Sequence, residues 1–347
     1  MTPLTTAGSG VEVAERLRAE VRERIAEALA GAAAPLSDVY VGWVAANETA
    51  TCPSRYRGQG ERGWGFPGWS PVLAGGAVGR AALAHHLTLA TALVPGGRPP
   101  PQPVPLDAIR TWMRALRFGP EGGGPPVEPS GVGDWIVETW ESGDAVTLAA
   151  VAAAAGRWLA GFVRVLGWPL PDRLTLLGAA SPSAAALPAW RPERDSPVRV
   201  AAGADARIGR ALGSPGPGGV TLVVHRATTG DDGALADRAA FEGCAGALAS
   251  GVAPAAVLVT AGDTGERVTV PVDDDVLARG AEQVLAVVEQ RVRAVDRGFD
   301  PADATPSPAC RHCEHLADCP PGQSWLQGPG RWRGGLPVLT PPRTCGG

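Results

Sequence analysis

The chain contains no lysine, because every residue in its Lys+Arg total of 31 is an arginine. A guanidinium stays protonated in proteins, so this chain can place positive charge but has no amino side chain that could shuttle a proton. The high content of alanine, glycine and proline is typical of a GC-rich genome and accounts for part of this absence. A catalytic step that requires a lysine is excluded all the same.

The chain also lacks an overall basic character, since its formal net charge is -4 over 347 residues. Any contact with DNA would therefore have to be local. There is no positively charged start followed by an apolar run and a small-residue cleavage site, and the longest apolar stretches are Ala-rich segments interrupted by Arg and Gly. We expect a soluble, cytoplasmic protein without a membrane partner.

Four of the six cysteines form the most informative pattern: Cys310, Cys313 and Cys319 follow a C-x2-C-x5-C spacing, and Cys52 lies far upstream. Thiolates are soft ligands that suit iron–sulfur clusters or zinc, and this run brings three sulfurs around one centre only if the chain turns tightly. Cys52 is available as the fourth ligand. The alternative is a set of buried thiols in a reducing cytosol.

The other two cysteines and the nearby histidines need no special role. Cys244 is interpreted as a buried helix thiol and Cys345 as a thiol of an irregular tail, because a secreted disulfide framework is not expected in a chain of this length. His312 and His315 lie between the clustered cysteines and are interpreted as exposed spacers.

The first half of the chain reads as mostly helical. Apolar spacing predicts a helix over residues 11–30, a loop over 58–76, a helix over 77–94 and an all-helical stretch over 106–178. In the second half, after a Pro- and Ser-rich linker, strands are predicted at 198–208, 220–224, 255–260 and 267–272, with helices at 235–250 and 276–297 and an irregular tail from 322. Strands between helices predict an α/β core with a mixed sheet.

Two phrases in this order resemble the RecB-type branch of the PD-(D/E)XK nuclease superfamily, including its CRISPR-associated and AddB-like members. One is the Cys-Pro phrase with basic and aromatic residues at 51–56, and the other is the Gly-Phe-x-Pro phrase at 298–301 that leads into the three-cysteine run. The likeness covers residues 37–320. It implies that the four cysteines hold a [4Fe-4S] cluster that joins the two ends of the nuclease domain, with zinc as the alternative.

The resemblance implies a restriction-endonuclease-like core, in which a mixed central sheet is flanked by helices, plus an inserted helical subdomain. The predicted division is an N-terminal helix at 1–36, a first part of the nuclease-like domain at 37–105, the helical insertion at 106–180, the α/β core at 181–320 and a tail at 321–347.

The catalytic phrases of the family are degenerate in this chain. Such nucleases hold divalent cations through an Asp and a second acidic residue two positions before a Lys, often with an upstream His. The phrase Gly-Arg-Ile-Asp-Arg is matched by residues 206–210, where Gly209 replaces the carboxylate, and the second phrase is matched by 222–228, where Val224 replaces the acid and Arg226 the lysine. A later Gln-x-x-x-Tyr phrase is matched by 240–244 without either polar residue.

We therefore expect a vestigial pocket with no catalytic residues and no bound magnesium or manganese. Its candidate residues are those that lie at or near the family positions: His85, His86, Asp205, His225 and Arg226.

Three functions are compatible with these residues. The favoured one is an inactive nuclease-like protein that binds DNA or acts as a scaffold in repair, recombination or defence, with a helicase or nuclease subunit as a possible protein partner. The second is an active metal-dependent DNA nuclease whose ligands have moved to Asp205, Glu242 or the pair Asp231 and Asp232. The third is a redox-sensing interaction protein that uses the cluster. The Arg-rich stretches 191–199 and 207–210 are candidates for phosphate contacts or plain surface.

Overall fold

The computed structural model describes segments in both halves of the chain. The described residues are 10–36, 39–52, 70–72, 74–80, 82–83, 131–166, 174–179, 189–210, 219–226, 232–261, 265–297, 300–306, 310, 313 and 316–327. The candidates His85 and His86, together with Asp231 and Cys345, lie outside these ranges.

A five-stranded mixed sheet forms the centre of the molecule. Its strands are β2 (Leu174–Ala179), β4 (Ala206–Arg210), β5 (Thr221–Arg226), β6 (Ala256–Ala261) and β7 (Arg267–Pro271), in the spatial order β2-β4-β5-β6-β7. The pair β5 and β6 is parallel and the other three pairs are antiparallel. The predicted α/β class with a mixed sheet flanked by helices is therefore confirmed.

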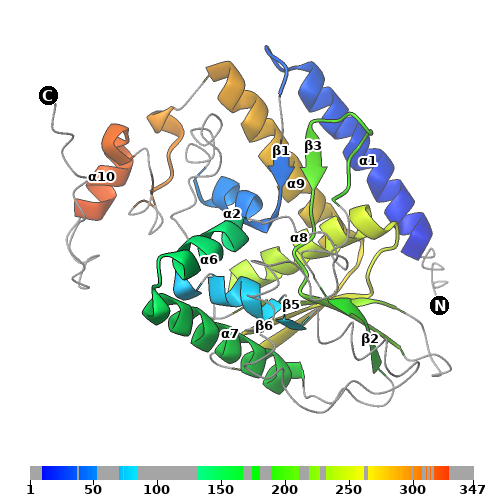
Figure 1. Cartoon of the computed structure of the whole chain (residues 1–347). Coiled ribbons are helices and arrows are strands. Elements are labelled where there is room, and N and C mark those ends of the chain that lie inside the picture. The colour runs from blue at the N-terminus through cyan, green and yellow to red at the C-terminus, as the bar shows by residue number, and fades with distance from the viewer. Residues whose placement is uncertain are drawn as a thin grey trace, which may run out of the picture.

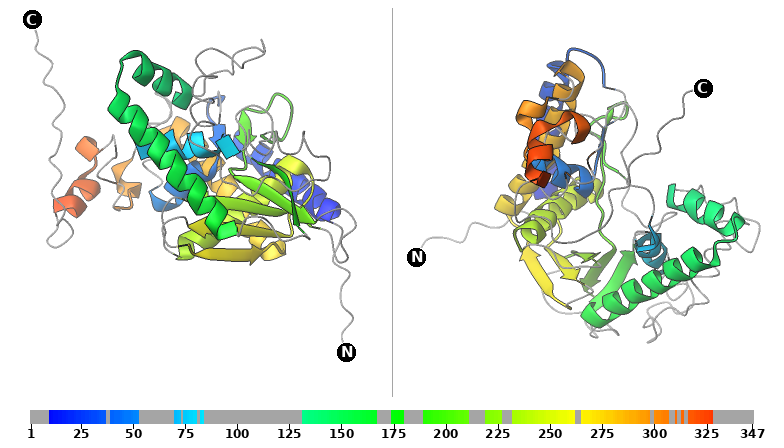
Figure 2. Two further views of the ribbon diagram at one scale, coloured as in Figure 1. Left: turned by 60° about the horizontal axis from the view of Figure 1, so that its bottom comes forward. Right: turned by 90° about the vertical axis from the view of Figure 1, so that its left-hand side faces the viewer.

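Each face of the sheet is covered by a helix, as the right-hand view of Figure 2 shows. Helix α7 (Ala145–Leu166) covers the face that presents Ile208 and Val223. Helix α8 (Asp232–Ser250) joins the parallel strands β5 and β6 and covers the face that presents Leu222 and Val224. Because successive residues of a strand point to opposite faces of the sheet, neighbouring residues of β5 pack in two different hydrophobic clusters.

A second layer beyond α8 joins segments from both ends of the chain (Figure 1). Its elements are α1 (Gly10–Ala30), α2 (Trp43–Thr51), α9 (Asp274–Arg297) and the short parallel pair of β1 (Val39–Val41) and β3 (Val198–Val200). Their buried residues form one apolar cluster with α8. The predicted first helix is thus confirmed and packs directly on the body of the protein.

Smaller elements complete the described chain. They are α6 (Gly131–Glu141), the single turns η1 (Pro301–Asp303) and η3 (Leu316–Asp318), and α10 (Pro320–Gln327). Helix α10 packs against η3 and η1 and lies at the left edge of Figure 1. It carries the last described residues, directly after the three-cysteine run.

Several element predictions are wrong, and each has a physical reason. Residues 174–179 form strand β2, where the end of a helix was predicted. An apolar run this short is compatible with both a helix and a strand, and its pairing with β4 in the folded chain selects the strand. The predicted strand over 198–208 is two strands in different sheets, β3 and β4. Residues 71–72 and 74–76 are helical where a loop was predicted, and the expected irregular tail begins with α10.

Helix α7 also has the length and hydropathy of a membrane span. Within the described part of the chain, Ala145–Val165 is the single stretch with this property. Its buried residues Val151, Trp158 and Phe162 pack in the same cluster as the strand residues Ile208 and Val223. Packing against the sheet therefore accounts for the buried part of this stretch, which is 39% of its most apolar window.

Candidate functional site

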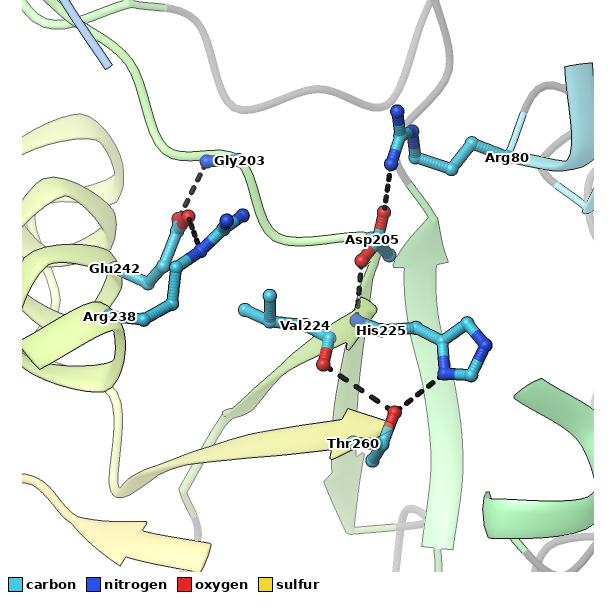
Figure 3. Close-up of polar contacts among 8 residues, drawn as sticks. All are labelled: Arg80, Gly203, Asp205, Val224, His225, Arg238, Glu242 and Thr260. Carbon is cyan, nitrogen blue, oxygen red and sulfur yellow. Dashed lines mark hydrogen bonds and ion pairs between the residues drawn. The ribbon is translucent and has the colours of Figure 1, made fainter. Parts of the chain in front are cut away.

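The antiparallel register of β4 and β5 places Asp205 directly beside Val224. Ala206 pairs with Val223, and one residue earlier the Asp205 amide donates to the Val223 carbonyl at 2.7 Å. The Asp205 carboxylate accepts from the His225 amide at 2.6 Å, so it lies beside Val224 (Figure 3). Gly209 lies beyond the opposite end of this pairing. The structure thus brings Asp205, and not Gly209, next to Val224.

Asp205 is buried and paired with Arg80. Its side chain is 2% exposed, and the Arg80 guanidinium lies 3.5 Å from one carboxylate oxygen. Burial raises the pKa of Asp205 above its ordinary value, and the positive charge of Arg80 opposes this rise. The hydrogen bond from the His225 amide also favours the ionised form of Asp205 and therefore opposes the rise in its pKa.

Arg80 reaches Asp205 because its helical segment approaches α7 very closely. A Cβ atom at Gly75 would lie 2.4 Å from the Ala154 Cβ, and one at Gly79 would lie 2.9 Å from the Trp158 ring. Two glycines one turn apart thus allow the backbones to touch. Arg80 follows the second glycine directly and is positioned by this contact.

A second buried carboxylate, Glu242, projects from α8 toward the same region (Figure 3). It is fully buried, accepts from the Gly203 amide at 2.6 Å and pairs with Arg238 at 3.1 Å. Burial raises its pKa, and the nearby charge of Asp205 adds to that rise. The guanidinium of Arg238 also lies 5.2 Å from the centre of the Trp43 ring, which favours a fixed position of the arginine.

His225 lies on the other face of β5, against α7. Its Nδ1 is 2.7 Å from the Thr260 hydroxyl, and its ring makes edge contacts with Trp158 and Phe162. Its Nε2 is buried without a hydrogen-bond partner, and burial lowers the pKa of His225 from 6.5 to about 4. The ring is thus a neutral core group whose side chain points away from Asp205 (Figure 3).

The buried neutral state of His225 predicts a loss of stability in mild acid. Between pH 6.5 and about 4 the unfolded chain binds a proton at this residue that the folded chain does not, so stability falls as the pH falls. From pH 7 to pH 5 we expect His225 to remove about 2 kcal/mol of unfolding free energy.

The measurement is urea unfolding of the wild type and of His225→Gln at both pH values. The change with pH should be smaller in the variant by that amount. The opposite contributions of Asp205 and Glu242, whose raised pKa values favour folding in acid, are common to both proteins and cancel. An identical pH dependence of the two proteins would contradict this assignment.

The cysteine segment turns tightly but does not form a complete metal site with Cys52. The Cys313 amide donates to the Cys310 carbonyl, the Leu316 amide to Cys313 and the Cys319 amide to Leu316, at 3.1 to 3.3 Å. Cys52, Cys310 and Cys319 are buried, and none of the described cysteines is in a disulfide. In the described part of the chain no group of three or more His, Cys, Asp or Glu side chains is arranged to hold a metal ion.

Two of these thiols nevertheless lie near one glycine of α10. The sulfurs of Cys310 and Cys319 both face Gly322, where a Cβ atom would lie 3.6 Å and 3.3 Å from them. The thiols of Cys310 and Cys319 therefore border one small space.

Other sequence candidates have varied outcomes. The side chain of Arg226 lies outside the described residues. Cys244 is a fully buried helix thiol, as predicted from the sequence. Burial raises the pKa of Cys244 to about 12. Sequence reasoning missed Arg80 and Arg238. The i,i+4 spacing of Arg238 and Glu242 was a usable signal, whereas nothing in the sequence links Arg80 to Asp205.

The chain matches no protein-family model, and no curated protein matches it in a sequence search. A proposal about function therefore depends on the geometry of the two buried carboxylates and of the cysteine segment.

Proposed function

We propose that this protein is a nuclease-like α/β protein of the RecB type in which hydrolysis has been lost and which serves as a DNA-binding or scaffolding module in repair, recombination or defence. The observation that carries the proposal is that each buried carboxylate is neutralised by an arginine, Asp205 by Arg80 and Glu242 by Arg238. Hydrolysis by a divalent cation needs carboxylate oxygens that are free to bind the cation.

The residue beside Asp205 supports the same conclusion. Val224 has a fully buried side chain and no lone pair, so it cannot act as the second acidic ligand. Arg226, in place of the lysine, keeps a positive charge but does not release a proton at neutral pH. The guanidinium groups thus provide the positive charge that a bound cation would supply, without its ability to activate water.

The direct test is a cleavage assay with purified full-length protein. In magnesium or manganese, labelled single- and double-stranded DNA should remain uncut over hours. Cleavage that disappears in Asp205→Asn would contradict the proposal, because a contaminating nuclease would be unaffected by that change.

One observation favours the alternative of an active nuclease with moved ligands. Asp205 and Glu242 are close enough for the charge of Asp205 to raise the pKa of Glu242. In that alternative both Asp205→Asn and Glu242→Gln abolish cleavage, and the wild type binds manganese. Absence of both results leaves the inactive protein as the better description.

The proposed DNA contact centres on Arg199. Its guanidinium lies 6.0 Å from the centre of the half-exposed Tyr40 ring, and the charges of Glu242 and Arg199 both act on the pKa of Tyr40. This arginine therefore lies beside an exposed aromatic ring. Aromatic rings and arginines at one surface are typical of contacts with nucleic acid.

Fluorescence anisotropy with labelled DNA at low salt measures this contact. Arg199→Gln should weaken binding several-fold and reduce its salt dependence. Arg16→Gln, which removes an exposed arginine of α1, is the matched control and should change neither. Equal binding by both variants would exclude Arg199 from the contact.

We also propose that Cys52, Cys310, Cys313 and Cys319 hold a [4Fe-4S] cluster, or alternatively zinc. When bound, such a centre would supply a covalent link between the N-terminal and C-terminal parts of the domain. Anaerobic purification followed by iron, sulfide and zinc analysis distinguishes the two. A redox-sensing role without DNA would instead give air-sensitive partner binding and no DNA affinity at low salt.

A further inference from the structure

Arg80 holds its buried partner by one long contact and keeps much of its side chain in solvent. Its Nη1 lies 3.5 Å from a carboxylate oxygen of Asp205, and the Arg80 side chain is 42% exposed. A guanidinium has five N–H donors in a planar fork, so this contact engages only a small part of what Arg80 can donate. In Figure 3 the other terminal nitrogen of Arg80 points away from Asp205.

The backbone beside Arg80 is fixed in place by packing. The preceding residue, Gly79, lies against the Trp158 ring of α7, where a Cβ atom would be only 2.9 Å from the ring. The turn that carries Arg80 therefore cannot move freely along α7. A charged donor that is held at one place loses less entropy when it binds an anion.

Asp205 has other stabilising partners besides Arg80. Its second carboxylate oxygen accepts from the His225 amide at 2.6 Å. The positive charge of Arg238 also opposes the rise in the pKa of Asp205. Arg80 can therefore exchange Asp205 for an external anion without leaving the buried carboxylate alone.

Arg80 is also within reach of a nucleic acid that contacts Arg199. Arg199 precedes Asp205 by six residues, which span at most about 20 Å. About six nucleotides of one strand cover this length at about 3.4 Å each. A short oligonucleotide is therefore long enough to meet both arginines.

We propose that Arg80 binds a backbone phosphate of a nucleic acid and that Asp205 competes with this phosphate for the guanidinium. The ligand class is a phosphodiester, whose oxygens match the donor fork of an arginine. This inference rests on the proposed DNA contact at Arg199. It adds an effect of opposite sign, because loss of the Asp205 charge should strengthen binding whereas loss of Arg199 should weaken it.

The test is fluorescence anisotropy with the full-length protein and labelled single- and double-stranded DNA, in EDTA so that no cleavage interferes. Asp205→Asn keeps an oxygen for the His225 amide and releases Arg80, so it should bind about 2- to 5-fold more tightly, as expected for loss of a competing, partly exposed ion pair. One added phosphate contact should steepen the salt slope by about 0.7 for single strands and 0.9 for duplex.

A double-mutant cycle separates this competition from a general effect of charge. Arg80→Gln and Arg80→Gln/Asp205→Asn should bind DNA equally, because without the guanidinium the Asp205 charge has nothing to compete for. Asp274→Asn is the matched control, since it releases the exposed Arg16 of α1 in the same way and should leave affinity unchanged.

Modification of the wild type with the arginine reagent phenylglyoxal gives a second measurement that does not depend on how Arg80→Gln folds. Bound DNA should protect Arg80, as mapped by mass spectrometry, and leave Arg16 reactive. If the wild type binds DNA, an unchanged affinity of Asp205→Asn, a gain that persists without Arg80 or an unprotected Arg80 would each overturn the role of Arg80 alone. Absence of binding by both the wild type and Asp205→Asn would overturn the proposed DNA contact itself.

Discussion

Replacing Gly280 with alanine is expected to lower the unfolding free energy by about 3 kcal/mol, because the crossing of α8 and α9 has no space for a side chain. A Cβ atom at Gly280 would lie 2.2 Å from the Ala240 carbonyl oxygen and 2.4 Å from the Cys244 Cβ. Both are parts of a buried helix, so the helices themselves would have to separate. The measurement is equilibrium urea unfolding followed by circular dichroism.

Gly156→Ala is the matched control for this prediction. Gly156 also lies within a helix, α7, but a Cβ atom there would have no neighbour within 4 Å. Alanine has the higher helix propensity, so this variant should gain up to about 1 kcal/mol. Opposite signs for the two substitutions would establish that close helix packing, and not helix propensity, determines the cost at Gly280. A loss below about 1 kcal/mol at Gly280 would contradict the described crossing.

The second large effect is expected at Arg238. Replacing it with methionine leaves the fully buried Glu242 with the Gly203 amide as the single remaining partner among the contacts described, and removing one member of a buried ion pair typically costs about 3 to 5 kcal/mol. We expect a loss of about 3 kcal/mol at neutral pH, measured by urea unfolding.

Arg293→Met provides the comparison within the same protein. Arg293 pairs with Glu289 at the same i,i+4 spacing in α9, but both side chains are nearly half exposed. Such pairs contribute about 0.5 kcal/mol or less. Similar losses for the two variants would show that the Arg238 pair is not buried as described.

The pH dependence of Arg238→Met gives an additional check. Burial raises the folded-state pKa of Glu242 above its unfolded value, so the stability linked to its protonated form is present in acid and lost as the pH rises. The deficit of the variant should therefore shrink as the pH approaches 4.5 and grow toward neutrality. A constant deficit would indicate that Glu242 is not the group responsible.

Several features were predictable because local patterns govern them. Amphipathic spacing predicted α1, α8 and α9, and runs of β-branched and apolar residues predicted β5, β6 and β7. The family resemblance also directed attention to Asp205 and His225, and it aligned Gly209 with the acidic ligand of the family. Which residue of β4 or its approach lies beside Val224 was not predictable from the sequence, since a shift of register between strands leaves each strand pattern unchanged.

Composition alone established that no lysine side chain takes part in any reaction of this chain. That conclusion follows from which side chains exist. Other features depend instead on contacts between segments that pack together in the folded chain. Examples are the ion pair of Arg80 with Asp205 and the approach of Cys310 and Cys319 to Gly322. Tertiary structure decides such contacts because burial and close approach are properties of the assembled core, which no local stretch of the chain encodes.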